Sequence, residues 1–113
     1  MNYARHHAWW GYIQAILRKY RVMRNEPDLQ GIDAREVEAV RVAIEKTKTL
    51  VPDGDHRIMM IDAIYWRRTL TMDGAALEQN ISYRTARRWH SEFVKLVAYE
   101  MGLADTPPND KLK

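Results

Sequence analysis

Hydrophobic residues recur every three or four positions along most of this chain, which is the spacing of one face of an α-helix. In residues 2–24 the spacing is regular, and Asn2 stands where an N-cap residue is expected. The apolar positions of this segment are Tyr3, Trp10, Ile13, Leu17 and Tyr20. The pattern therefore predicts one long N-terminal helix.

Trp9 and Ile16 widen the apolar face of this first helix. An apolar face larger than a small domain can cover is typical of a contact with another molecule. Two interpretations stay open at this point: an ordinary core face, or a seam at which two copies of the chain form a homodimer.

The second helix is expected to begin at Asp33, after a break at residues 25–33 that contains a proline and a glycine. Asp33 and Glu36 have the spacing of a capping box, in which each side chain accepts a hydrogen bond from a free amide of the first turn. The inner face of this helix then continues through Val37, Val40, Ile44, Thr47 and Val51.

A third helix is expected over Asp55 to Arg68, with Asp55 as its N-cap. Residues 58–66 are apolar almost all round, as in a helix buried in the middle of a bundle. Arg67 and Arg68 fall at its C-terminal end, where a positive charge stabilises the helix dipole. That structural role and a contact with DNA both remain open for these two arginines.

The last third of the chain has the layout of a helix-turn-helix. A short helix over residues 72–79 is followed by Asn80, which tolerates the positive φ angle of a tight turn better than any residue except glycine. Ile81 is then expected to enter the core, and Ser82 to cap a long second helix over residues 83–101. Gly102 is expected to end that helix as the C′ glycine.

The long second helix has two different faces. Its apolar face is formed by Ala86, Trp89, Phe93, Leu96 and Val97, and its opposite side carries Arg84, Arg88, Ser91 and Lys95. Major-groove readers keep their base contacts near the amino end of this helix. The candidate DNA-contacting residues are Tyr83, Arg84, Thr85, Arg87, Arg88, Ser91 and Lys95. Arg84, Arg87 and Arg88 are expected to read bases, and Lys95 to lie over the DNA backbone.

Length and charge fit this layout. The 113 residues are enough for one small core, so we expect a single all-helical domain over residues 1–103 and a disordered tail over 104–113. Basic residues cluster: residues 1–24 hold five and no acid, and residues 63–101 hold six against four acids. Clustered positive charge is the electrostatic pattern of a nucleic-acid binder.

Other function classes find little support in the sequence. The chain has no cysteine, no stretch long and apolar enough to cross a membrane and no signal-peptide pattern, so we expect a cytoplasmic protein. No metal-ligand spacing, phosphate loop or paired catalytic carboxylates occurs. We therefore expect neither an enzyme nor a cofactor.

Residues 52–103 also resemble a known family. The segments concerned are "IYWRR" (64–68), "LTMDGAAL" (70–77), "NIS" (80–82) and "RTARRWHSEFVKLVA" (84–98). They resemble the carboxy-terminal region of the RinA/ArpU phage transcriptional regulators, whose DNA-binding part is similar to sigma-factor region 4. The resemblance implies a DNA-binding activator of phage late genes, with residues 52–103 as the DNA-binding region. Residues 5–20 have no counterpart in it.

The sequence thus predicts a small bundle of about five helices that ends in a helix-turn-helix and binds double-stranded DNA. Three candidate binding partners stay open for the long N-terminal helix: RNA polymerase, DNA or a second subunit. Two alternatives to a regulator remain. One is the DNA-recognition subunit of a phage packaging terminase, and the other is a helical protein-interaction module that never touches DNA.

Overall fold

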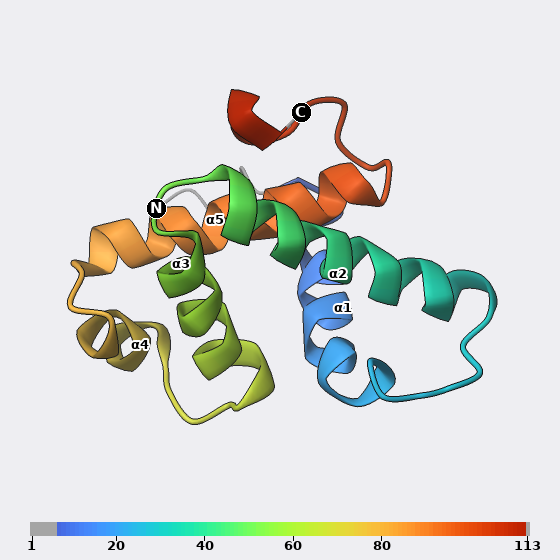
Figure 1. Ribbon diagram of the computed structural model, residues 1–113, viewed down its shortest axis with the longest axis horizontal. Coiled ribbons are helices and arrows are strands. Elements are labelled where there is room, and N and C mark those ends of the chain that lie inside the picture. The colour runs from blue at the N-terminus through green and yellow to red at the C-terminus, as the bar shows by residue number, and fades with distance from the viewer. Residues whose placement is uncertain (1–6, 113) are drawn as a thin grey trace.

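Helix α5 (Tyr83–Glu100) runs through the molecule and contacts all four other α-helices (Figure 1). The computed structural model describes residues 7–112. The elements that surround α5 are α1 (Trp10–Met23), α2 (Gly31–Leu50), α3 (Gly54–Ile61), a π-helical turn η2 (Asp62–Trp66) that extends α3, α4 (Met72–Glu78) and a 3₁₀ turn η3 (Asp110–Leu112). The prediction of a small all-α bundle of about five helices is confirmed.

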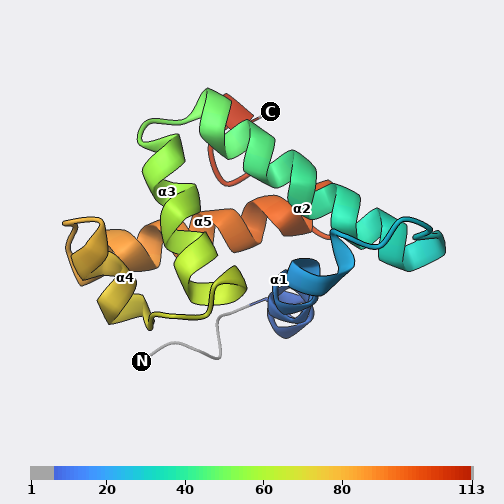
Figure 2. The same cartoon turned by 60° about the horizontal axis from the view of Figure 1, so that its bottom comes forward.

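The helix-turn-helix lies at one end of the molecule. In both ribbon views, α4 and the first turns of α5 are at one end of the longest axis, and the start of α2 is at the other end (Figures 1 and 2). Helix α3 packs against both α4 and α5. This three-helix arrangement fixes how α5 is presented.

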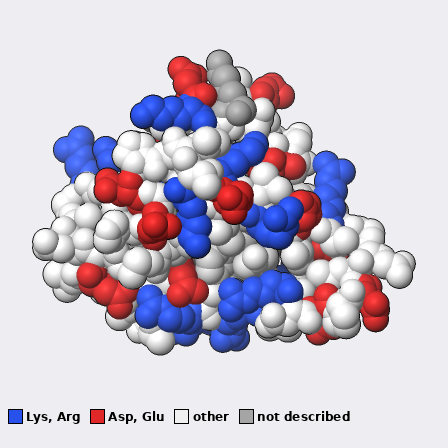
Figure 3. All heavy atoms as spheres, in the orientation of Figure 1, with Lys and Arg blue, Asp and Glu red and all other residues white. Residues whose placement is uncertain are grey.

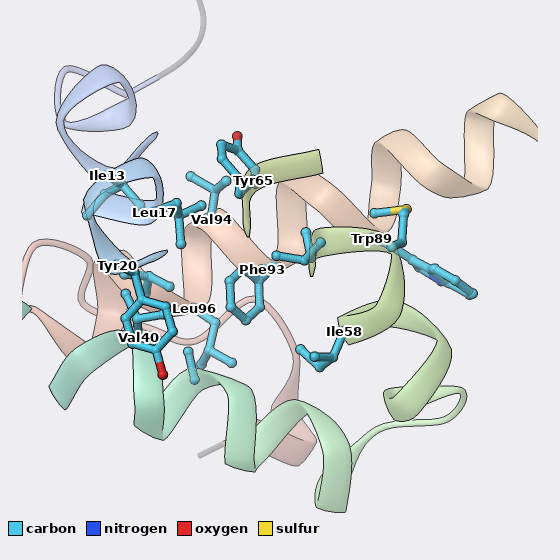
Figure 4. Close-up of a cluster of buried hydrophobic side chains, with 14 of the residues drawn as sticks. Ile13, Leu17, Tyr20, Val40, Ile58, Tyr65, Trp89, Phe93, Val94 and Leu96 are labelled. Carbon is cyan, nitrogen blue, oxygen red and sulfur yellow. The ribbon is translucent and has the colours of Figure 1, made fainter. Parts of the chain in front are cut away.

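The hydrophobic core lies on the inner side of α5. Phe93 is central in Figure 4, between Leu17 of α1 and Ile58 of α3. The ring of Trp66 meets Phe93 edge-on, with 6.4 Å between the ring centroids, and its indole N–H donates to the backbone oxygen of Leu17 at 3.0 Å. The predicted apolar face is confirmed, because all its members are buried: Ala86, Trp89, Phe93, Leu96 and Val97.

Helix α1 is shorter than predicted. It begins at Trp10, and residues 7–9 form a turn in which the Trp10 N–H bonds to the His7 oxygen at 2.9 Å. The rings of His7 and Trp9 stack within this turn, with centroids 4.6 Å apart. The expected start at Tyr3 and cap at Asn2 lie outside the described residues.

The apolar face of α1 is covered by the same chain. Its residues Ile13, Ile16 and Leu17 are at most 2% exposed. Trp9 and Trp10 are half-buried against the core. The core of this chain therefore uses these three residues, while Tyr12 and Val22 of α1 are exposed, and the homodimer stays a prediction.

The predicted capping box at the start of α2 is wrong. The helix begins at Gly31, and Glu36 is a buried side chain rather than a cap. The Tyr12 hydroxyl donates to Glu36 Oε2 at 2.5 Å, and Lys19 Nζ lies 2.8 Å from Glu36 Oε1. Glu36 is drawn inward because α1 offers it a donor and a cation.

The start of α3 also differs from the prediction. Asp53, not Asp55, precedes the helix, and it has φ +59° with no side-chain cap hydrogen bond. Gly54 follows because a Cβ there would lie 2.2 Å from the Thr47 oxygen of α2. Met59 is 49% exposed, so this segment is not buried all round.

None of the described helices is both long and apolar enough to cross a membrane.

The turn between α4 and α5 has the predicted geometry. Asn80 has φ +57°, and the N–H groups of Asn80 and Ile81 bond to the oxygens of Leu77 and Ala76 at 3.1 and 3.0 Å. This pair of hydrogen bonds is the Schellman motif that ends a helix. The Ser82 hydroxyl accepts from the Thr85 N–H at 3.0 Å and so caps α5 as expected.

The C-terminal segment is ordered where it was predicted to be disordered. Leu112 of η3 is 3% exposed and joins the hydrophobic core, and η3 packs against α2. The Lys111 N–H donates to Asn109 Oδ1 at 2.9 Å, which starts the turn. Ala104 of the same segment also packs against the core. The prediction for 104–113 is therefore wrong for residues 104–112, and residue 113 lies outside the described part.

We predict that Asn80→Ala lowers the free energy of unfolding by about 1 kcal/mol, because the left-handed conformation that Asn80 adopts is sterically unfavourable for alanine. Asn80→Gly should match the wild type or exceed it by about 0.5 kcal/mol. Urea denaturation of the three proteins measures both effects. Equal stability of the alanine and glycine variants would contradict this account of the turn.

The Tyr12 hydrogen bond predicts a loss of stability in alkaline solution. The bond to Glu36, aided by desolvation and by the Glu36 charge, raises the pKa of Tyr12 from 10.0 to about 12. The contribution of Tyr12 to folding is complete below about pH 10 and is lost as the pH rises towards 12. Urea denaturation between pH 9 and pH 12 should therefore show a smaller decline for Tyr12→Phe than for the wild type. Identical declines would mean that the hydrogen bond is absent in solution.

Candidate nucleic-acid interface

The outer side of α5 is open over its first turns and borders a hollow of about 620 Å³. We name it the α5 hollow. Its walls come from the start of α1, the first residue of α4 and α5 itself. The residues that line it are Trp10, Gln14, Met72, Tyr83, Arg84, Arg87, Arg88, His90 and Ser91. The helix-turn-helix therefore presents its basic residues beside a concave surface rather than on a free-standing rod.

Helix α1 limits how much of α5 is open. His90, Val94 and Ala98 are buried in addition to the predicted apolar face, and α1 contacts α5. The rings of Trp10 and His90 meet edge-on, with centroids 6.1 Å apart. Because these three residues lie at successive turns, α1 covers the side of α5 that would otherwise continue the open face. Only the part near Tyr83 to Ser91 is left open.

Five of the seven predicted contact residues line the α5 hollow. They are Tyr83, Arg84, Arg87, Arg88 and Ser91. Arg84, Arg87 and Arg88 are all exposed. The Arg87 guanidinium lies over the Tyr83 ring, 5.9 Å from its centroid, so these two side chains support each other at the rim.

Thr85 and Lys95 lie elsewhere. Thr85 is half-buried, and its hydroxyl accepts from the Ser82 hydroxyl at 3.1 Å, so it belongs to the cap of α5. Lys95 is half-buried beside a separate hollow of about 480 Å³, which His7, Trp9 and the segment from Leu103 to Pro108 also line. The sequence predicted both side chains on the outer face. It could not show that Thr85 takes part in the helix cap, or that the turn before α1 and the C-terminal segment enclose Lys95.

Positive charge in the α5 hollow is uncompensated. None of the residues that line it is acidic, and Arg84, Arg87 and Arg88 form no ion pair within residues 7–112. Arg57 on the inner side is different: its guanidinium is 2.6 Å from Glu92 and lies over the Trp89 ring. The face seen in Figure 3 likewise carries basic and acidic side chains side by side. The arginines of the hollow thus differ from Arg57, which has a carboxylate partner.

A hydrogen-bonded chain of side chains stiffens the floor of the hollow. Gln14 Nε2 donates to the Tyr65 hydroxyl at 3.1 Å, and that hydroxyl is 2.6 Å from His90 Nε2. The Tyr65 and His90 rings also stack with centroids 5.6 Å apart. Burial raises the pKa of Tyr65, while the Gln14 hydrogen bond and the Arg18 charge oppose that shift. The chain of contacts joins α1, η2 and α5 beneath the hollow.

The chemistry of this surface is that of anion binding. Guanidinium groups donate several hydrogen bonds in a plane and match phosphate oxygens or the O6 and N7 atoms of guanine. An α-helix about 10–12 Å wide fits a major groove about 12 Å wide. Within residues 7–112, no group of three or more His, Cys, Asp or Glu residues is placed to hold a metal ion.

Sequence reasoning missed the residues that other elements contribute. Trp10, Gln14 and Met72 reach the hollow only because α1 and α4 fold against α5. His90 has no periodic signal, since it adjoins Trp89 on the apolar side of the helix. The excess of basic residues in the first 24 positions was a usable signal that α1 shares in the charged surface.

Comparison of this chain with protein-family models, with curated protein sequences and with solved structures finds no match.

Proposed function

We propose that this protein binds double-stranded DNA and reads sequence in the major groove with the first turns of α5. The observation that carries the proposal is a set of three exposed arginines at the amino end of the second helix of a helix-turn-helix, none of which forms an ion pair with another described residue. Double-stranded DNA offers such arginines two kinds of partner. Its backbone phosphates form dense rows of negative charge, and the base edges in the groove between the two backbones carry hydrogen-bond acceptors. A solvated surface helix would more often carry arginines next to acids.

The side chains divide into two roles. Arg84, Arg87 and Arg88 make the base contacts, and one well-placed bidentate arginine discriminates between bases by about 1–3 kcal/mol. Tyr83 and Ser91, at the edges of the same hollow, contact the sugar–phosphate backbone. Lys95 lies too far along α5 to enter the groove with them and contributes through charge.

The biological role we propose is a cytoplasmic phage regulator of transcription. The support is the resemblance of residues 64–98 to the RinA/ArpU regulators, together with the helix-turn-helix geometry at Asn80 and Ser82. Regulators of this kind act at promoters, so RNA polymerase is the protein partner that follows from the proposal. A terminase small subunit would use the same surface but would assemble into a ring, which a mass measurement in solution distinguishes.

The competing proposal is a protein-interaction module without DNA binding. It depended on an apolar face of α1 that the domain leaves uncovered. Ile13, Ile16 and Leu17 are buried within the chain, so the large apolar residues that α1 still exposes are Tyr12 and Val22.

The test begins with selection of bound fragments from a random duplex pool, followed by binding titrations on the selected duplex. Arg84→Ala and Arg88→Ala should each weaken binding to the selected duplex by at least about fivefold, the lower end of the 1–3 kcal/mol range. Each should weaken binding to an unselected duplex much less, because a base contact carries sequence information.

Arg41→Ala provides the matched control. Arg41 is an exposed arginine on α2 that pairs with Glu38 and does not line the α5 hollow. The Arg41→Ala variant loses the same charge as the other two variants. Its affinities for the selected and the unselected duplex should stay within about twofold of the wild-type values. Failure to recover any sequence, or equal behaviour of the Arg84, Arg88 and Arg41 variants, would remove the proposed function.

A further inference from the structure

A second hollow of about 270 Å³ adjoins the α5 hollow. The two share Gln14, Met72 and His90 in their walls, so they form one continuous depression. The second hollow brings in residues from α1, η2 and the connection to α4: Arg18, Ile64, Tyr65 and Arg68. None of the residues that line it is acidic.

Arg68 occupies this place at a conformational cost. Its φ angle is +54°, in the left-handed region that a non-glycine side chain rarely adopts. The neighbouring Arg67 is neutralised, because its guanidinium is 2.8 Å from Asp62 and 3.2 Å from Glu78. Arg68 is exposed and forms no ion pair within the described residues. The two adjacent arginines therefore differ in their surroundings. Arg67 belongs to a local ion-pair network, and Arg68 lines the second hollow.

Arg18 reaches the same hollow from α1. It is exposed, it forms no ion pair in the part of the chain that the structure describes, and its charge acts on the Tyr65 hydroxyl at the floor of the depression. One turn earlier on α1, Gln14 borders both hollows. Arg18 and Arg68 therefore flank the open part of α5 from elements outside the helix-turn-helix.

We infer that Arg18 and Arg68 bind backbone phosphates of the DNA strand that borders the groove occupied by α5. This inference rests on the proposed function. A helix 10–12 Å wide fills a groove about 12 Å wide, so a protein surface that adjoins the helix meets the sugar–phosphate wall and not the bases. Two unpaired guanidinium groups without an acidic neighbour match the phosphates of that wall.

The test is a salt titration of binding with Arg18→Gln, Arg68→Gly and the double variant, using both the selected and an unselected duplex. Each single variant should weaken binding to the two duplexes by the same factor, about three- to tenfold at moderate salt. Each should also reduce the slope of log affinity against log salt by about 0.9, the value for one phosphate contact. The ratio of the two affinities should not change, because phosphates carry no sequence information.

Arg68→Gly separates binding from folding. Glycine removes the strain of the left-handed φ, so this variant should melt at a higher temperature than the wild type while it binds DNA more weakly. Arg18→Lys, which keeps the charge, should keep the salt slope. Arg41→Ala, which removes a charge outside both hollows, should also leave the slope unchanged.

The outcomes distinguish the inference from the function on which it rests. If Arg84→Ala and Arg88→Ala lower specificity but Arg18→Gln and Arg68→Gly leave both the affinity and the salt slope unchanged, the phosphate inference is overturned and the proposed function stands. A change in the ratio of the two affinities would also overturn it, since it would make these arginines base readers. If the wild type binds no duplex, both fail.

Discussion

Helix α5 is the central helix of the hydrophobic core and also carries the candidate DNA-contacting surface. Because it has both roles, core packing decides which of its side chains are exposed to solvent. Packing against α1, α2 and α3 buries most of its circumference, including His90, Val94 and Ala98. A helix buried this widely can offer solvent only the strip that no neighbour covers. That strip is the amino-terminal part with Arg84, Arg87 and Arg88. The position of the surface is therefore a consequence of core packing.

The distribution of ion pairs follows the same constraint. Two cations close to the packed sides of α5 have partners: Arg57 pairs with Glu92, and Lys46 with Glu100 at 2.5 Å. A charge that loses part of its hydration in a helix contact needs a counter-charge to remain stable. The arginines of the two adjoining hollows keep their hydration and need no partner. The two adjoining hollows thus bring together five arginines with no acidic residue in their walls, in a protein whose formal net charge is only +3.

The elements that local chemistry determines were predictable from the sequence. The turn at Asn80 depends on a residue type that tolerates positive φ, and the cap at Ser82 on a hydroxyl one residue before the helix. Both therefore appear where the pattern placed them. Glu36 shows the opposite case: its spacing from Asp33 indicated a capping box, but tertiary contacts with Tyr12 and Lys19 determine its position. Leu112 likewise has a partner surface only in the folded chain.

The candidate site divides in the same way. Arg84, Arg87 and Arg88 share one segment, so helical periodicity was enough to group them. Arg18 and Arg68 are fifty positions apart in the sequence and share a hollow only because α1 and η2 pack side by side. Periodicity within one segment cannot reveal such a pair. The strained φ of Arg68 is visible only in three dimensions, since no sequence rule places an arginine in the left-handed region.

The central claim is that duplex DNA contacts the open strip of α5 at the two adjoining hollows. The most direct test is a titration of isotope-labelled protein with the selected duplex, followed by the amide chemical shifts of each residue. We predict that the amides of residues 83–91, with those near Arg18 and Arg68, shift or broaden, while the exposed side of α2 around Arg41 does not change. Perturbations centred on α2, with the amides of residues 83–91 unaffected, would contradict the account.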